Sequence, residues 1–340
     1  MENILQLTVY GIVIGSIIGL GSMGLTLSYG VTKFANFAHG DIMSLAMYFA
    51  YFIVVDLGLM GPTVFSLSFG WGMFLAIIAT IILLAIFSIA VDKLIYKKLR
   101  RDKSNIVTMA IASLGVGIII RAAVTMIWGP SARTFVPGIH EAIPIVGNIL
   151  IKPDQIFIVG LTLIVTLVMY YLLYHTKLGK AMRATADNPD LAAISGINID
   201  NILAYTWAIT GALTAVAGIM LGIQAQVYIN LGFNLLLPMF ASMIKENKKL
   251  DELVKLSFSL IFLPAIVVAI FCASFSNKLM ELMYKGTTDA SGVLVLLMFC
   301  FVAIASTYIF GTLLTANGSL RTLNKLAIGG MVLNLVLNYI

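Results

Sequence analysis

The feature that most constrains this chain is its succession of long tracts without a charged residue. The tracts are Asn3 to Thr32, Ile42 to Val55, Leu57 to Val91, Ile106 to Ile120, Gln155 to Thr176, Ile202 to Ile244, Leu256 to Asn277 and Ala290 to Leu320. Several supply the roughly 20 apolar residues that a membrane-spanning helix requires. With 60% hydrophobic and 11% charged residues, the chain lies outside the range of soluble globular domains. We expect an all-α, polytopic integral membrane protein with about nine or ten transmembrane helices.

Basic residues form short clusters beside these tracts, which predicts the orientation of the helices. The clusters at Lys93 to Lys103 and at Lys177 to Arg183 should both face the cytoplasm, so an even number of crossings separates them. The expected helices are residues 8–30, 42–60, 65–91, 106–128, 155–176, 202–223, 227–244, 254–275 and 291–314, with the amino terminus outside. The net charge of +6 therefore indicates topology, and no nucleic-acid partner is expected.

Glycines recur every four residues in two of the expected helices. Gly11, Gly15 and Gly19 share one face of the first helix, and Gly218 and Gly222 share a face of the sixth. Such small-residue faces let helix backbones approach closely in lipid. We interpret both faces as helix-packing surfaces, although glycine is also simply common in membrane helices.

One polar segment, Lys177 to Ile202, separates two long apolar tracts. Within it, Asn188 can cap a short helix that begins at Pro189 and ends at Gly196, with Leu191 and Ile194 exposed. A helix of about two turns is marginal alone, so we expect a partner to hold it, most naturally a soluble, energy-supplying subunit. The alternative is an ordinary solvated connection between helices.

Two polar features fall inside or beside the apolar tracts. Asn36, His39 and Asp41 lie where the first helix ends and the second begins, and they either contact a substrate or cap the second helix, where the helix dipole favours an acidic residue. Arg121 is a charge within an apolar helix, so it either faces the interior of the bundle or extends toward the outer interface. One His and one Asp do not make a metal-ligand set.

The sequence contains no GxxxxGK[ST] loop and no plausible catalytic constellation. The two cysteines, Cys272 and Cys300, lie inside apolar tracts, where a small buried side chain explains them. We therefore expect neither enzyme activity nor a metal or cofactor in this chain. Any ATP that drives it must be hydrolysed by a separate subunit.

Three ordered motifs carry a family resemblance. The strings NFAHGD (Asn36 to Asp41), WGPSARTFVP (Trp128 to Pro137) and GKAMRATADNPDLAAISGIN (Gly179 to Asn198) resemble the permease of bacterial branched-chain amino-acid ABC importers, over residues 4–233. The resemblance implies alternating access in the inner membrane, with two permease subunits, two ATPase subunits and a periplasmic amino-acid-binding protein. The polar segment would be the docking loop. Its expected coupling residues are Arg183, Asp187, Asn188, Pro189, Leu191, Ala192 and Gly196.

The remaining sequence departs from this pattern. Residues 236–340, which begin LLPMFASMIKENKKLDELVK, are similar to the middle of polysaccharide flippases. The chain is thus expected to divide into a permease-like part, residues 1–235, and a flippase-like fragment, residues 236–340. The alternative functions are a flippase for lipid-linked oligosaccharides and an inactive fusion of two incomplete transporters. We expect the first, second, fourth and sixth helices to line the path, with Asn36, His39, Asp41 and Arg121 as its candidate residues.

Overall fold

A computed structural model describes residues 2–136, 142–144, 150–236 and 263–278, together with residues 291, 292, 295 and 298. The chain forms two compact units, Met1–Leu236 and Leu237–Ile340. The division follows Leu236, next to the junction expected after residue 235. In the second unit, helix α12 spans Leu263–Ser274, inside the predicted helix 254–275. The predictions for the basic helix after Leu236, for the span at 291–314 and for the rest of the flippase-like sequence lie almost wholly outside the described residues.

Long apolar helices make up the first unit, which confirms the all-α, polytopic prediction. Five of the described helical segments are long and apolar enough to cross a membrane. They fall on α1 (Glu2–Thr32), α3 (Trp71–Val91), α5 (Ile106–Trp128), α6 (Pro153–His175) and α9 (Ile199–Gln224). Helix α3 continues without a break through a π-helical turn, η2 (Asp92–Tyr96), into α4 (Lys97–Arg101). A two-stranded antiparallel sheet, β1 (Ile143–Pro144) and β2 (Leu150–Ile151), connects α5 to α6.

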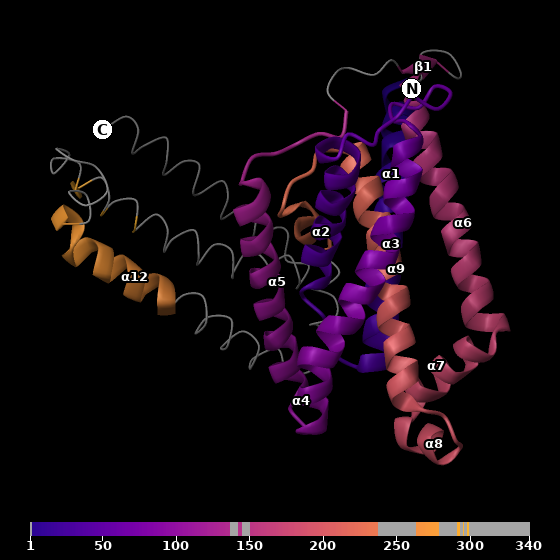
Figure 1. The fold of residues 1–340 in the computed structure, drawn as a ribbon, viewed down its shortest axis with the longest axis vertical. Helices are drawn as coiled ribbons and strands as arrows, with labels where there is room; N and C mark the ends of the chain where they lie inside the picture. The colour runs from indigo at the N-terminus through magenta and orange to yellow at the C-terminus, as the bar shows by residue number, and fades with distance from the viewer. Residues whose placement is uncertain are drawn as a thin grey trace. The chain divides into compact units, whose positions relative to one another are not determined.

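Both basic clusters lie at the same end of the bundle, as the even number of crossings requires. Figure 1 shows α4 at this basic end together with α7 (Lys177–Asp187) and α8 (Pro189–Ile194). The amino terminus and the β1–β2 hairpin lie at the opposite end, where the Gln6 side chain hydrogen-bonds the backbone N–H and C=O of Leu150. The predicted alternation of helix directions from the first to the sixth expected helix is therefore confirmed.

Helix α9 lies at the centre of the unit and contacts α1, α2 (His39–Tyr51) and α3. Its close packing depends on its glycines. A Cβ on Gly218 would stand 2.2 Å from the carbonyl oxygen of Met43 in α2, and one on Gly222 would stand 2.6 Å from the ring of Phe135. Both glycines therefore lie where neighbouring groups approach α9 closely, which supports their predicted packing role.

The glycine face predicted on the first helix has no neighbour among the described residues. Gly11, Gly15 and Gly19 are exposed, and no described atom would lie within 4 Å of a Cβ on any of them. The glycines of α1 that face the bundle are Gly21 and Gly24, and a Cβ on Gly24 would meet the His39 ring at 3.0 Å. The four-residue period identifies a face that permits close approach, but the position of α2 decides which face is used.

Helix α2 differs most from its predicted span of residues 42–60. It begins earlier, at His39, and continues as a π-helical turn, η1 (Phe52–Asp56). It ends before Gly58, which adopts a φ of 67°. All but one of its residues are buried, so α2 is a core helix of the unit and not a lipid-facing span.

Candidate functional site

The connection from α1 to α2 folds back into the bundle. His39, the first residue of α2, lies beside Gly21 and Gly24, well before the end of α1 at Thr32. The non-helical segment that joins the two helices is also buried: Phe34 and Ala38 are fully buried, and Asn36 is 1% exposed. Irregular backbone at membrane depth is tolerated where protein surrounds it or where it lines a cavity. The NFAHGD motif therefore forms the break before an internal helix.

Hydrogen bonds from two neighbouring elements, α5 and η2, hold this break. The backbone N–H of Phe37 donates to Ser113 Oγ of α5 at 2.9 Å, and the Tyr96 hydroxyl donates to Asn36 Oδ1 at 3.1 Å. Among the described residues, Asn36 Nδ2 is buried and has no hydrogen-bond partner. A buried amide donor that lacks a partner is a place where a water molecule or a ligand can be bound.

Asp41 lies in the first turn of α2, as the helix-dipole argument expects, but the predicted side-chain capping by Asn36, His39 and Asp41 is wrong. The N-cap of α2 is Ala38, and no side chain there accepts a hydrogen bond from the helix. His39 instead lies 3.0 Å, Nε2 to O, from the carbonyl of Gly21 in α1, and its ring also contacts Thr214 of α9. The side chains of the motif contact other helices, and the His39 amide at the start of α2 donates to the backbone carbonyl of Asn36.

Asp41 and Arg121 form an ion pair between α2 and α5. Arg121 Nε lies 2.6 Å from Asp41 Oδ1, and Nη2 lies 3.1 Å from Oδ2. Asp41 is 1% exposed, and the Arg121 side chain is 33% exposed with its guanidinium 4.8 Å above the ring of Phe233. Arg121 thus faces the interior of the bundle, which decides between its two predicted orientations.

Two glycines make room for this ion pair. A Cβ on Gly117 would stand 2.3 Å from Asp41 Oδ2, and a Cβ on Gly40 would stand 2.5 Å from the backbone of Phe233. The amide of Gly232 donates to Ser44 Oγ, so the segment before Leu236 is fixed against α2. The sequence analysis did not single out this segment. The available signal was a glycine, Gly232, next to an aromatic residue, Phe233, far along the chain from the Gly40–Asp41 pair that it meets.

The polar segment after α6 has the predicted local structure. Asn188 Oδ1 accepts from the Leu191 amide at 3.0 Å, and Pro189 is the first residue of α8. Gly196 adopts a φ of 86°, and the amides of Gly196 and Ile197 donate to the carbonyls of Ala193 and Ala192. These are the two hydrogen bonds of a Schellman C-cap.

The side chains of this segment divide into an anchored and a free group. Ala192 is buried, whereas Leu191 is 61% and Ile194 is 83% exposed. Arg183 of α7 is exposed and lies 5.2 Å over the ring of Tyr174, and Asp187 ends α7 next to the Asn188 cap. α7 was not expected as a separate helix. Gly179 allows its sharp turn from α6, because a Cβ there would stand 2.3 Å from the Leu173 carbonyl oxygen.

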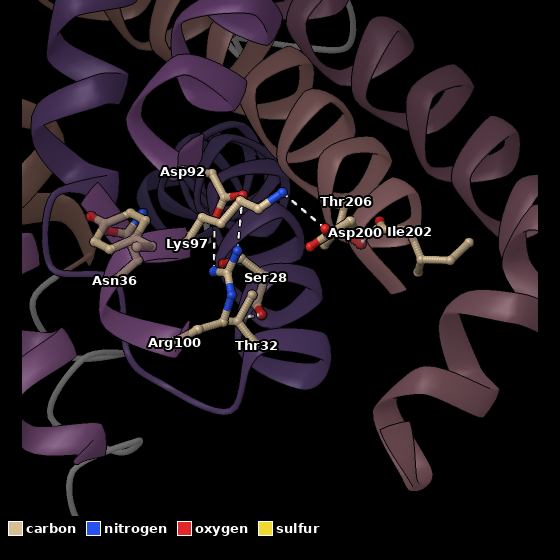
Figure 2. Close-up of polar contacts among 10 residues, drawn as sticks. Ser28, Thr32, Asn36, Asp92, Lys97, Arg100, Asp200, Ile202 and Thr206 are labelled. Atoms are coloured by element: carbon tan, nitrogen blue, oxygen red, sulfur yellow. Dashed lines mark hydrogen bonds and ion pairs between the residues drawn. The ribbon is translucent and has the colours of Figure 1, made fainter. Parts of the chain in front are cut away.

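Two ion pairs at the basic end were also missed, because the lysines and arginines there were interpreted only as topology signals. Figure 2 shows Lys97 directed toward Asp200 and Arg100 toward Asp92, at 2.9 Å and 2.7 Å. Asp200 lies in the first turn of α9, two residues after its cap Asn198. The Lys97–Asp200 contact therefore joins α4 to the helix that follows α8. The available signals were Asp200 near the start of the sixth expected helix and Asp92 directly after the third.

Long apolar helices around a buried ion pair and a broken internal helix define a polytopic membrane protein of the transport class. A family model described as the permease component of branched-chain amino acid transport systems matches residues 7–245. The chain belongs to this family. The matched region runs from α1 through α9 and includes every candidate site residue named above.

Individual relatives agree with the family match. The high-affinity branched-chain amino acid transport system permease protein BraD of Pseudomonas aeruginosa is 31% identical over 237 residues, 68% of this chain and 75% of that protein. The corresponding LivH protein of Escherichia coli is 28% identical over 224 residues, 64% and 70% of the two chains. A probable LivH permease of Methanocaldococcus jannaschii is 28% identical over 240 residues, 68% and 71%. No solved structure matches the chain.

The family match continues to residue 245, past the expected junction. Neither it nor these relatives support the flippase resemblance of residues 236–340 or the interpretation of the chain as a fusion. Those two statements stay predictions.

Proposed function

We propose that this chain is the membrane-spanning permease subunit of an ATP-driven importer for branched-chain amino acids. The observation that carries the proposal is the family match over residues 7–245, which includes both the buried ion pair and the capped segment α8. The relatives named above are permease proteins of branched-chain amino acid transport systems. A permease is not an enzyme, and this chain would move its substrate by alternating access.

Helix α8 is the proposed docking element for an ATPase subunit. Its ends are fixed by Asn188 and Gly196 and its inner side by the buried Ala192, so the exposed Leu191 and Ile194 are held ready for a partner at little entropic cost. Arg183, Asp187 and Pro189 would complete the surface. The guanidinium of Arg183 lies 5.2 Å over the ring of Tyr174, a cation–π contact that would hold this charge at the start of the surface.

Helix α9 would transmit a movement of α8 to the proposed translocation pathway. Only a short connection separates Gly196 from Asn198, which caps α9, and α9 contacts α1, α2 and α3. His39 touches α9 at Thr214 and α1 at Gly21, so a shift of α9 changes the surroundings of the break before α2. Asn36, His39, Asp41 and Arg121 are the proposed pathway residues for this reason.

The expected partners are two ATPase subunits, a second permease subunit and a periplasmic amino-acid-binding protein. The chain would lie in the bacterial inner membrane with its basic end in the cytoplasm. A single cysteine at an exposed position of α8, Ala193→Cys in a chain whose Cys272 and Cys300 are replaced by alanine, tests this orientation. The thiol should react with an impermeant reagent in inverted vesicles and not in intact cells. Labelling from outside intact cells would overturn the assignment of the docking element.

The decisive experiment is uptake of labelled leucine by vesicles that contain the chain, with and without its ATPase and binding-protein partners. ATP-dependent uptake only in the complete system supports the proposal. Transfer of a lipid-linked oligosaccharide in vesicles without the ATPase would instead support the flippase prediction. Absence of both activities would support an inactive chain.

The role of the ion pair is tested by a double-variant cycle. Arg121→Gln leaves the buried Asp41 carboxylate without its partner, which should cost about 3–5 kcal/mol of stability. Asp41→Asn leaves the Arg121 guanidinium, whose side chain is 33% exposed, and should cost less. The double variant removes both charges and should regain much of that stability. If the charges act on the substrate, leucine uptake stays low in the double variant. Recovery of uptake together with stability would show a purely structural pair.

A further inference from the structure

A small polar pocket lies at the opposite end of the bundle, away from α8. The start of α6, the end of α9, the beginning of α3 and the chain that follows α5 line it, and its volume is about 170 Å³. Figure 1 shows that these helix ends lie at the end of the bundle that carries the amino terminus. With the basic end in the cytoplasm, the pocket faces the side from which an importer receives its substrate.

Asp154 supplies a buried negative charge to this pocket. It is 7% exposed and lies in the first turn of α6. Among the described residues it accepts one hydrogen bond, from the Ser68 amide to Oδ1 at 2.9 Å. Oδ2 receives no hydrogen bond from the described part of the chain. Asp154 lines the pocket, so a carboxylate oxygen that no described donor satisfies is free to accept a ligand cation there.

Lys152 supplies a positive charge to the same pocket. It does not pair with Asp154, because the ion pairs of the described residues join Lys97 to Asp200, Arg100 to Asp92 and Arg121 to Asp41. The backbone amides at the start of α6 add a favourable field for an anion on the Lys152 side. The carbonyl end of α9, which stops at Gln224, adds a favourable field for a cation.

The remaining wall is apolar. Phe69 and Met73 are fully buried and Phe135 is 5% exposed, and all three line the pocket. Gly222 lines it as well, and a Cβ there would press against the Phe135 ring at 2.6 Å. The pocket thus combines separate positive and negative groups with an apolar wall.

We propose that this pocket binds a free amino acid with an apolar side chain as an entry site of the permease. The α-ammonium group would bind Asp154 Oδ2, the α-carboxylate would bind Lys152, and the side chain would pack against Phe69, Met73 and Phe135. This inference rests on the proposed function, since it assigns a site to the proposed substrate class. Phe135 belongs to the WGPSARTFVP motif, whereas Phe69, Met73, Lys152 and Asp154 lie outside the three motifs that carried the family resemblance.

The test measures binding of tritiated leucine to the purified permease complex in the absence of the amino-acid-binding protein, which would itself retain leucine. Competitors are 4-methylpentanoate, which lacks the ammonium group, and 3-methylbutylamine, which lacks the carboxylate. The complex should prefer leucine to both. Asp154→Asn, whose side-chain oxygen can still accept from Ser68, should weaken leucine binding about tenfold or more and abolish the preference over 4-methylpentanoate. Lys152→Met should abolish the preference over 3-methylbutylamine.

Matched controls are Asp102→Asn and Lys103→Met, which remove the same charges at the basic end and should bind leucine as the unaltered chain does. Absence of leucine binding by the unaltered complex would overturn the inference. An Asp154→Asn variant that binds leucine normally, or that loses affinity for all three compounds equally, would also overturn it. Leucine binding without ATP-driven uptake would contradict the proposed function and leave the pocket supported, so the two failures are distinguishable.

Discussion

The two glycine faces of this chain have the same spacing and different surroundings. On α9, Gly218 and Gly222 lie against α2 and Phe135 so closely that neither has room for a methyl group. On α1, Gly11, Gly15 and Gly19 face no described atom within 4 Å. A four-residue glycine repeat therefore indicates that another backbone can approach that face of the helix. The tertiary fold determines whether a neighbour lies there.

The difference follows from the position of α2. Because the chain turns back into the bundle after Thr32, α2 needs a groove on its neighbours along its whole length. α9 provides that groove with its glycines, and α1 provides it with Gly21 and Gly24 on the opposite side from the predicted face. The glycines that matter are those that contact α2.

The largest effect should come from Gly218→Leu. The new side chain would begin 2.2 Å from the Met43 carbonyl oxygen, in backbone that cannot move without displacing α2. We expect a loss of about 3 kcal/mol or more and little monodisperse protein in size-exclusion chromatography after expression. Gly19→Leu on the exposed face of α1 is the matched control and should elute normally. Equal behaviour of the two variants would remove the distinction between the faces.

A smaller effect is expected for Gly40→Ala. One methyl group would lie 2.5 Å from the Phe233 Cα atom and would separate α2 from the segment that covers Arg121. The expected loss is about 1–3 kcal/mol, measured as a shift in the denaturation midpoint in detergent. Gly160→Ala, at an exposed glycine of α6 with no described neighbour, should not lower the midpoint. A midpoint for Gly40→Ala equal to that control would mean that α2 and Phe233 are not held so closely.

Gly196 is required for a different reason, since space around it is open and its φ is 86°. Gly196→Ala should cost about 1–2 kcal/mol locally, because a Cβ is disfavoured in the left-handed region. Hydrogen exchange at Ile197, whose amide closes the α8 cap, should accelerate about tenfold while the global midpoint stays unchanged. Gly196→Asn, which tolerates this conformation better, should accelerate exchange less. Identical exchange in both variants would argue against the cap.

Local signals in the sequence were sufficient for the capped segment and for the helix directions. Asn188, Pro189 and Gly196 form contacts within a few residues of one another, so their geometry is contained in the local pattern. The basic clusters predict the helix directions through the charge of the loops, and that charge can be counted from the sequence without knowing the fold. These two predictions needed no knowledge of which helices touch.

The buried site depends on contacts between residues far apart in the chain. Asp41 and Arg121 were both selected, but their pairing needs α2 to lie against α5, and the glycine at position 117 that permits it looked ordinary. The bounds and the burial of α2 were not predicted, because its continuous apolar sequence suits a core helix and a lipid-facing helix equally. Period and composition cannot separate these two cases.

The smallest effect should come from Gly15→Ala on α1. The position is exposed and helical, and a methyl group there meets no described atom, so the only local change is the loss of backbone freedom that glycine brings to the unfolded chain. We expect an unchanged or slightly raised denaturation midpoint for the chain alone, by at most about 1 kcal/mol. Gly24→Ala, on the face of the same helix that meets His39 at 3.0 Å, is the matched comparison and should lower the midpoint. If Gly15→Ala were the more destabilising of the two, the predicted glycine face of α1 would be a packing face. Helix α1 would then have to be rotated about its own axis relative to this fold.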